Sequence, residues 1–481
     1  MLHTYEGNME NSTIAAIATP AGSGGIGIVR ISGSRALSIA SSIFCHGSLK
    51  KNLYPSKASD SKKIQSFTSH KAYYGHIINP ETRCIIDEVL LIPMIVPNSY
   101  TREDVVEIQA HSGHMILQSI LTLILQHGAN IAEPGEFTRR AFLNGRIDLS
   151  QAEAVMDIIN AKTEKALEIA SAQKTGYFRE HIESIRNYLL DVLAEIEAAI
   201  DFPDEMEDFS FTFIEPESYK THVLDKIHFL LQQYNSGHVF RDGIRVFIAG
   251  RPNVGKSSIF NCLIQKDRSI VTPFPGTTRD FIEETINLSG LPVNVMDTAG
   301  LHETDDPVEV IGIQKACENI SASDLILFVV DGSYELTVED KNIYHKIKHK
   351  PFIIILNKTD LIMKTIENTI PQSWNQRQCV ETSALHNKGI NEIKNAIINV
   401  ALDGKNTDTF SAVVPNIRHK LLLEKCLKLV CSASRSFSCQ EPAELTSIEI
   451  REAIGLMDDI IGINPSYDVL DQIFSRFCLG K

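Results

Sequence analysis

The stretch Gly250-Arg-Pro-Asn-Val-Gly-Lys-Ser257 has the pattern G-x-x-x-x-G-K-S, and it lies between an apolar run at residues 244–249 and a segment with helical spacing at residues 258–264. A strand, a glycine-rich turn and the start of a helix together form a phosphate-binding loop, in which backbone N–H groups face anionic oxygens. Lys256 is expected to contact the β- and γ-phosphates, and Ser257 is expected to bind Mg²⁺. The stretch therefore predicts a nucleoside triphosphate site.

Four further motifs follow in a fixed order and identify the nucleotide. Thr278 is placed to give a hydroxyl to Mg²⁺, and Asp297-Thr-Ala-Gly300 offers an acid for Mg²⁺ and a glycine N–H for the γ-phosphate. In Asn357-Lys-Thr-Asp360, the final carboxylate can accept from guanine N1–H and N2–H₂ together, which adenine does not offer. The N–H of Ala384, in Thr382–Leu385, is expected to meet guanine O6. Together the motifs predict GTP as the ligand.

Length and composition limit the class of protein. At 481 residues the chain is expected to hold about three domains of ~150 residues each. A net charge of −14 argues against a protein that grips nucleic acid over its whole surface, although a local basic patch or a basic partner remains open. Nine cysteines without a C-x-x-C pair indicate neither a disulfide framework nor a zinc site, and they favour a reducing, cytoplasmic location. No run of 18 apolar residues predicts a membrane span.

Periodicity divides the chain into an N-terminal α+β domain, a helical bundle domain, and an α/β domain inserted into the helical domain. The nucleotide motifs lie in the inserted domain and predict a Ras-like doubly wound P-loop GTPase domain there. The expected domain limits are 1–147, 148–242 with 403–481, and 243–402. The expected strands lie at residues 14–18, 27–31, 72–78, 88–96, 105–110, 244–249, 292–296, 325–330 and 352–356. Ser150-Gln-Ala-Glu153 reads as a capping box opening a long helical stretch, and Asn235-Ser-Gly237 as a helix break.

Two other patterns are only weak evidence for a ligand or metal site. Gly22-Ser-Gly-Gly-Ile-Gly27 matches the dinucleotide fingerprint G-x-G-x-x-G, but a strand follows it where a helix is required, which favours a tight glycine turn. His111 and His114 lack clustered cysteines or further histidines, which favours a loop or packing role over a metal site.

The motif order resembles the translation-factor-related GTPases, and G-x-P-N-V-G-K-S with P-G-T-T-R-D resembles their Era-like branch. Four motifs outside the nucleotide segment resemble the MnmE (TrmE) family: Ile17-Ala-Thr-Pro-Ala-Gly-Ser-Gly-Gly-Ile-Gly-Ile-Val-Arg-Ile-Ser-Gly33, Pro134-Gly-Glu-Phe-Thr-Arg-Arg-Ala-Phe-Leu-Asn-Gly-Arg146, Asp201-Phe-Pro-Asp-Glu205 and Phe477-Cys-Leu-Gly-Lys481. They lie in the family's order, and the resemblance covers essentially the whole chain.

The resemblance implies a tRNA-modifying GTPase that forms a homodimer through an N-terminal folate-binding domain. It implies a heterotetramer with the flavin protein MnmG (GidA), which adds a (carboxymethyl)aminomethyl group to C5 of the wobble uridine of certain tRNAs. A tetrahydrofolate derivative, in the 5-formyl or 5,10-methylene form, would supply the one-carbon unit.

The resemblance also implies which residues and which ion take part in GTP hydrolysis. Leu301 stands where Ras-type switches carry a water-orienting glutamine, and a leucine cannot orient water, so another group is required. The family pattern gives that role to Glu309, while His302 occupies a position where many members have arginine. It implies that K⁺ acts as a fixed positive charge when two GTPase domains meet. The implied K⁺ ligands are Asn253, Thr272, Phe274 and Thr277.

The candidate residues fall into three groups. The residues expected to bind GTP are Asn253, Val254, Gly255, Lys256, Ser257, Ser258, Thr272, Pro273, Phe274, Pro275, Gly276, Thr277, Thr278, Asp297, Thr298, Ala299, Gly300, Asn357, Lys358, Asp360, Ser383 and Ala384, with Ser257 and Thr278 on Mg²⁺. The positions that the resemblance places near folate are Arg30, Glu107, Arg146 and Lys481. It places Cys478 near the same pocket as a required thiol; the alternatives are a buried structural cysteine and a C-a-a-X lipidation box, which the terminal Gly-Lys disfavours.

Two rival readings remain open from the sequence. One is a regulatory or ribosome-assembly GTPase that acts as a scaffold without modification chemistry. In the other, the N-terminal domain serves only dimerisation.

Overall fold

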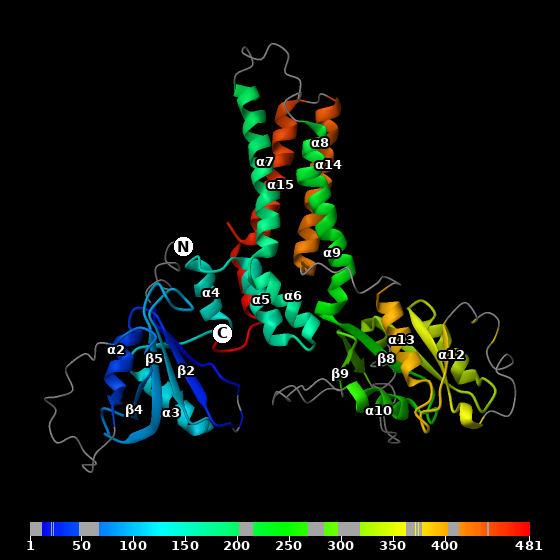
Figure 1. The fold of residues 1–481 in the computed structure, drawn as a ribbon, viewed down its shortest axis with the longest axis horizontal. Coiled ribbons are helices and arrows are strands. Elements are labelled where there is room, and N and C mark those ends of the chain that lie inside the picture. Colours follow the sequence, from blue (N-terminus) through cyan, green and yellow to red (C-terminus); the bar gives the residue numbers. More distant parts are fainter. Residues whose placement is uncertain are drawn as a thin grey trace. The chain divides into compact units, whose positions relative to one another are not determined.

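A computed structural model describes residues 12–20, 22, 24–47, 67–201, 215–267, 283–296, 318–361, 371, 374, 378–402, 413–439 and 442–481. These residues form two compact units. Figure 1 labels the helices and strands of both. The first unit contains the described residues up to 153 together with 461–481, and the second contains the described residues from 154 to 460.

The first unit is built on a seven-stranded sheet in the order β3-β4-β5-β6-β2-β1-β7. Neighbouring strands are antiparallel, except for the parallel pair β1 and β7. The strands are β1 (Ile14–Ile17), β2 (Gly27–Ser32), β3 (Phe44–His46), β4 (Tyr73–Ile78), β5 (Ile85–Met94), β6 (Val105–Ala110) and β7 (Asn130–Ile131). Helices α2 (Ala36–Ile43) and α3 (His114–Gln126) bury apolar side chains in a shared core with the strands, so the expected α+β domain is confirmed.

The C-terminal segment packs into this first unit. Helix α4 (Glu136–Leu143) begins after Gly135, where an added Cβ would lie 2.7 Å from the carbonyl oxygen of Phe474 in α16 (Tyr467–Phe474). A Cβ at Gly480 would lie 2.4 Å from the carbonyl oxygen of Ile17. Both glycines have left-handed backbones, with φ of 71° and 84°. The two glycines therefore allow the C-terminal segment to pack closely against α4 and β1. The domain limits given above stay a prediction.

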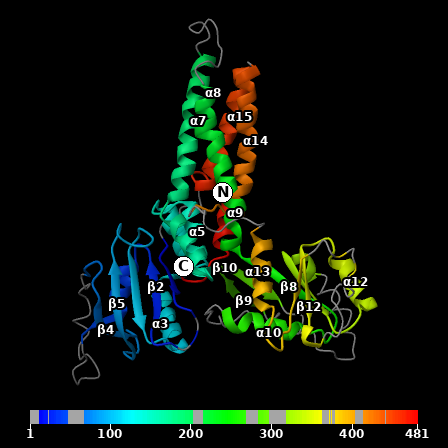
Figure 2. The ribbon, with the colours of Figure 1, turned by 45° about the vertical axis from the view of Figure 1, so that its right-hand side comes forward.

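The helices of the second unit come from both sides of the nucleotide segment. They are α5 (Leu149–Asn160), which begins in the first unit, α6 (Glu164–Lys174), α7 (Tyr177–Asp201), α8 (Pro216–Tyr219), the π-helical turn η3 (Lys220–Leu224), α9 (Asp225–Asp242), α14 (Ile417–Cys439) and α15 (Ala443–Ile461). The Tyr219 hydroxyl donates to the Val430 carbonyl at 3.1 Å, and the Phe178 and His419 rings stack with centroids 4.6 Å apart. Figure 2 shows α7, α9, α14 and α15 side by side, which confirms a GTPase domain inserted into a helical one.

The start of α5 differs from the expected one. The capping pair is Asp148 and Gln151: the Gln151 N–H donates to Asp148 Oδ1, and the Asp148 N–H donates to Gln151 Oε1, both at 2.9 Å. Ser150 lies inside the helix and donates its hydroxyl to Asp148. The predicted capping box at 150–153 is therefore wrong by two residues, because Asp148 and Gln151 form the reciprocal cap earlier and leave Ser150 inside the helix. The long helical stretch is also divided into α5, α6 and α7.

The predicted break at Asn235–Gly237 is wrong, because α9 runs through these residues. Gly237 is buried inside the helix, and a Cβ there would lie 2.5 Å from Cγ2 of Val414. The glycine thus allows close packing against the chain that leads into α14, at the usual cost in helix propensity.

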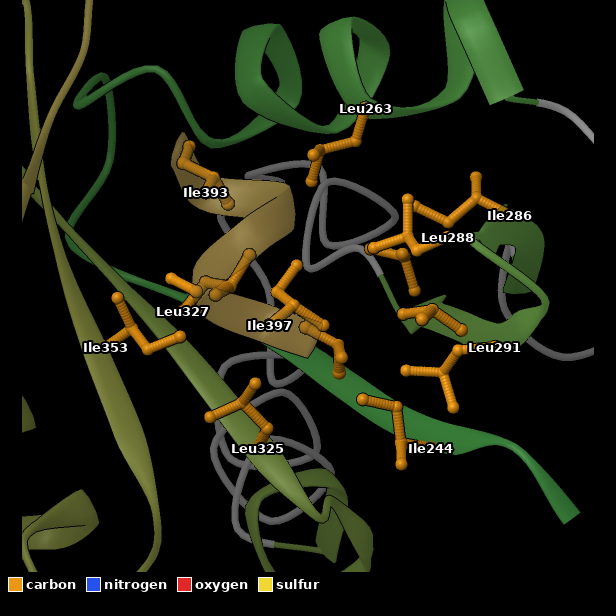
Figure 3. Close-up of a cluster of buried hydrophobic side chains, with 14 of the residues drawn as sticks. Ile244, Leu263, Ile286, Leu288, Leu291, Leu325, Leu327, Ile353, Ile393 and Ile397 are labelled. Atoms are coloured by element: carbon orange, nitrogen blue, oxygen red, sulfur yellow. The ribbon is translucent and has the colours of Figure 1, made fainter. Parts of the chain in front are cut away.

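The GTPase domain has a six-stranded sheet in the order β13-β12-β11-β8-β10-β9, parallel except for the β9–β10 pair. Its elements are β8 (Ile244–Ala249), α10 (Lys256–Asp267), β9 (Glu283–Leu288), β10 (Leu291–Met296), β11 (Leu325–Asp331), α12 (Val338–Ile347), β12 (Phe352–Asn357), the 3₁₀ turn η4 (Thr359–Leu361), β13 (Cys379–Glu381) and α13 (Ile390–Ala401). Figure 3 shows Ile393 and Ile397 of α13 in a buried cluster with the strand residue Leu327. The four predicted strands are confirmed, and β9 and β13 were not predicted.

Two expectations from composition can be compared with the described part of the chain. The eight cysteines there are free, and no helix there is long and apolar enough to cross a membrane.

Gly237 and Gly455 give a matched test of helix packing. Gly237→Ala should lower the free energy of unfolding by about 1–3 kcal/mol, because the new methyl meets the buried Val414 side chain. Gly455→Ala, in α15 with nothing within 4 Å of its Cβ, should raise it by up to ~1 kcal/mol. Urea denaturation measures both. Equal effects of the two substitutions would contradict the packing explanation, and adding Val414→Ala should partly restore the first variant.

Candidate functional site

The phosphate loop follows β8, which lies between β11 and β10 in the sheet. Parallel strands direct their carboxyl ends to one edge, which is where open α/β sheets bind ligands. The loop needs unusual backbone angles: Asn253 has φ of 63° and Gly255 has φ of 98°. α10 then begins at Lys256, so its N-terminus closes the loop as the sequence predicts.

The buried side chain of Asn357 joins three segments of the site. Its Nδ2 donates to the Val254 carbonyl at 2.9 Å, and its Oδ1 accepts from the Ala384 N–H at 3.1 Å. A Cβ at position 255 would lie 2.3 Å from Nδ2, so only glycine fits there. An amide NH₂ has a second hydrogen, which leaves one for guanine N7. The Ala384 N–H is already engaged by Asn357, and its expected contact with O6 stays a prediction.

Two lysines donate hydrogen bonds to backbone carbonyls of the phosphate loop. Lys256 Nζ donates to the Gly250 and Arg251 carbonyls, each at 3.0 Å. Lys358 Nζ donates to the Asn253 carbonyl at 2.8 Å and to Asp331 Oδ2 at 2.7 Å. The first ammonium lies within the loop that phosphates would occupy, and the second holds Asn253 in its left-handed conformation.

Asp331 contacts Lys358 at the site, and it was not among the residues predicted from the sequence. It ends β11 and is 3% exposed. Burial acts to raise the pKa of Asp331, but hydrogen bonds from Lys358 and Ser333 outweigh burial and hold this pKa below its ordinary value. The available signal was an acid at the carboxyl end of an apolar strand next to the nucleotide strand.

The residues for the base are placed by η4 and the loop after β13. Ser383 Oγ donates to Asp360 Oδ1 at 2.6 Å. This hydrogen bond is the main cause that lowers the pKa of Asp360 below its ordinary value. The carboxylate is therefore ionised and oriented before any base arrives, as recognition of two guanine N–H groups requires.

Several predicted residues lie outside the described residues, and their roles stay predictions. They are Thr272, Pro273, Phe274, Pro275, Gly276, Thr277, Thr278, Asp297, Thr298, Ala299, Gly300, Leu301, His302 and Glu309.

A second group of candidates meets in the first unit. Arg30 on β2 and Glu107 on β6 are direct strand partners, with Arg30 Nε 2.9 Å from Glu107 Oε1. Arg30 also donates to the Gly480 carbonyl at 3.1 Å, and its guanidinium lies 5.5 Å from the Phe137 ring centroid. A half-buried carboxylate and guanidinium beside aromatic rings suit a flat heterocycle with donor and acceptor edges, so these residues fit a pterin.

Arg146 and the chain end complete this group. Arg146 donates to the Tyr100 carbonyl at 2.8 Å, and its guanidinium lies 4.8 Å from the Tyr100 ring centroid; the guanidinium of Arg30 is 5.8 Å from the same centroid. The Lys481 carbonyl accepts from the Phe137 N–H at 3.2 Å. Cys478 is exposed, which makes the reading of a buried structural cysteine wrong.

Two family models match the chain. The model described as "MnmE helical domain" matches residues 149–478, and "GTP-binding protein TrmE N-terminus" matches residues 13–146. The chain belongs to the MnmE family.

Curated MnmE relatives match over nearly the whole chain, and each is called a tRNA modification GTPase. The relative from Alkaliphilus oremlandii is 40% identical over 472 residues, covering 98% of this chain and 99% of the relative. That from Carboxydothermus hydrogenoformans is 42% identical over 477 residues (98% and 100%), and that from Thermoanaerobacter sp. is 43% identical over 470 residues (98% and 99%). The resemblance to the MnmE family inferred from the sequence motifs is thus confirmed.

The two weaker sequence patterns of this MnmE-family chain also fall largely within the described residues. His111 Nδ1 lies 2.8 Å from Asp87 Oδ1, and that hydrogen bond raises the pKa of His111. Within the described residues, no three His, Cys, Asp or Glu side chains are grouped as metal ligands. The Gly24 N–H donates to the Ser112 hydroxyl at 2.7 Å, and strand β2 follows the glycines, as the turn interpretation expects.

Removing the Ser383 hydroxyl should change the pH dependence of guanine binding. The pKa of Asp360 is lowered mainly by this hydroxyl, so it should rise in Ser383→Ala. Because binding needs the ionised carboxylate, GDP affinity should be lost at a higher pH than in the wild type as the pH falls. At pH 7.5 affinity should fall about fivefold, for a lost hydrogen bond of ~1 kcal/mol.

Calorimetric GDP titration between pH 4.5 and 8 measures both effects. The exposed α14 variant Ser438→Ala serves as a control with unchanged affinity. If Ser383→Ala and the wild type lost GDP affinity at the same pH, the role given to this hydrogen bond would be contradicted.

Proposed function

We propose that this chain hydrolyses GTP to drive a step in the modification of tRNA. The observation that carries the proposal is the Asn357 side chain, which joins the phosphate loop to the loop at Thr382–Leu385 after β13 (the base loop). The chain is also at least 40% identical to tRNA modification GTPases over nearly its whole length. Lys256 would neutralise the β- and γ-phosphates, Ser257 would hold Mg²⁺, and Asp360 would select guanine.

Hydrolysis would depend on a second copy of the chain. Asn253, Thr272, Phe274 and Thr277 would hold K⁺, which supplies a fixed positive charge at the phosphates. The exposed side chain of Asn253 supports this, because Lys358 bonds only the backbone carbonyl of Asn253 and the side-chain amide oxygen remains as a ligand for K⁺. Glu309 would orient the attacking water in place of the glutamine that Leu301 replaces.

The dependence on K⁺ can be measured directly. GTP hydrolysis should be at least tenfold faster in KCl than in NaCl, and equal rates in the two salts would contradict the role given to K⁺.

The first unit would bind the carbon donor and the second copy. Arg30 and Glu107 would hold the pterin of a tetrahydrofolate, which supplies the one-carbon unit. With the flavin protein MnmG as partner, the product would be a (carboxymethyl)aminomethyl group on C5 of the wobble uridine. A cytoplasmic location follows from such a role. Cys478, exposed near the chain end, is proposed as a thiol required for modification and not for hydrolysis.

Nucleoside analysis of tRNA tests the function directly. A bacterial strain lacking its own MnmE-family gene should regain the wobble modification when it expresses this chain, and should not regain it with Lys256→Ala. Cys478→Ser should hydrolyse GTP normally and fail to restore the nucleoside.

An unchanged nucleoside profile with wild-type protein, despite normal GTP hydrolysis and assembly with MnmG, would favour a scaffold GTPase and overturn the proposal. Restoration by Cys478→Ser would overturn the role of that thiol alone.

A further inference from the structure

A hollow of about 510 Å³ lies in the first unit, next to the Arg30–Glu107 pair. It is lined by His70, Met94, Pro97, Asn98, Ser99, Tyr100, Arg102 and Arg146. Its volume is within the range of small-molecule sites. The ring of Tyr100 connects the hollow to the pair, because the guanidinium groups of Arg146 and Arg30 both lie within 6 Å of its centroid.

The two arginines of the hollow are held in place by backbone contacts. Arg102 donates to the Asn144 carbonyl at 3.0 Å, and Arg146 donates to the Tyr100 carbonyl at 2.8 Å. The Asn144 side chain donates in turn to the Thr101 carbonyl at 2.6 Å. Three hydrogen bonds thus join the two loops that carry the arginines, and a left-handed backbone at Arg102 (φ of 57°) fixes its position further. The site is built before a ligand arrives.

The positive charge of these arginines is not matched by a neighbouring acid. Among the described residues, neither Arg102 nor Arg146 forms an ion pair with a carboxylate. The two acids that follow Arg102 in sequence are engaged elsewhere: Glu103 with Arg140 at 3.1 Å, and Asp104 with the Val96 N–H at 3.0 Å. Each guanidinium has five N–H donors and uses one on a neutral carbonyl, so most remain for an anion.

We propose that this hollow binds the γ-linked glutamate carboxylates of a folate, and so makes the protein prefer polyglutamylated folates. The proposal rests on the proposed folate function, with the pterin at Arg30 and Glu107. Guanidinium groups bind carboxylates with two parallel hydrogen bonds, and two arginines side by side suit successive carboxylates along one chain. Because Tyr100 lines the hollow and also contacts Arg30, the hollow lies beside the proposed pterin position, which favours the tail of the same molecule over a phosphate of RNA.

The test is calorimetric titration of the full chain with 5-formyltetrahydrofolate carrying one or five glutamates. The wild type should bind the pentaglutamate at least tenfold more tightly than the monoglutamate. Arg102→Gln should reduce that ratio to about two or less and leave monoglutamate affinity within twofold of wild type. Arg102→Lys should keep part of the preference, because it keeps the charge and loses the paired hydrogen bonds.

Arg83→Gln is a matched control, because Arg83 is also exposed with φ of 57° but does not line the hollow. It should keep the wild-type ratio. Equal affinity of the wild type for both folates would overturn this inference and leave folate binding intact. A preference unchanged in Arg102→Gln would overturn it as well. No binding of either folate would contradict the proposed folate function and the inference with it.

Discussion

One buried amide holds the nucleotide site together. Asn357, at the end of β12, bonds the Val254 carbonyl of the phosphate loop and the Ala384 N–H of the base loop with the two atoms of its side chain. Gly255 is required because any Cβ would meet that amide. Lys358 then reaches the Asn253 carbonyl from the next position. The phosphate and base subsites therefore depend on each other before nucleotide binds.

The same domain is also hydrogen-bonded to the segment between α5 and α6. Lys162 Nζ, just after α5, donates to Thr285 Oγ1 at 2.9 Å, and Thr163 donates to the Gly290 carbonyl at 2.9 Å. Both acceptors belong to the β9–β10 hairpin, which lies in sequence between the predicted Mg²⁺ residues Thr278 and Asp297. The β9–β10 hairpin therefore connects the helical part of the chain to two segments that are predicted to bind Mg²⁺.

The features that could be predicted from the sequence are those set by short-range patterns of residues. The phosphate loop, the order of the guanine motifs and the buried strands follow from glycine spacing and apolar runs. Asp331 and Gly237 were missed because their roles depend on the tertiary partners Lys358 and Val414. The Asp148 cap is local, and it was missed because Asp148 with Gln151 and Ser150 with Glu153 are two overlapping capping patterns in the sequence. Arg30 and Glu107 were found only through family resemblance, since strand pairing places residues 77 positions apart beside each other.

Hydrogen exchange of the nucleotide-free protein tests the central role of Asn357 most directly. In Asn357→Ala, peptides covering residues 250–258 and 381–386 should both exchange about tenfold faster, because two buried hydrogen bonds are lost at ~1–3 kcal/mol each. Peptides from α3 in the first unit should be unchanged. Faster exchange in the base loop alone, with the phosphate loop as protected as in the wild type, would contradict the claim that one side chain couples the two subsites.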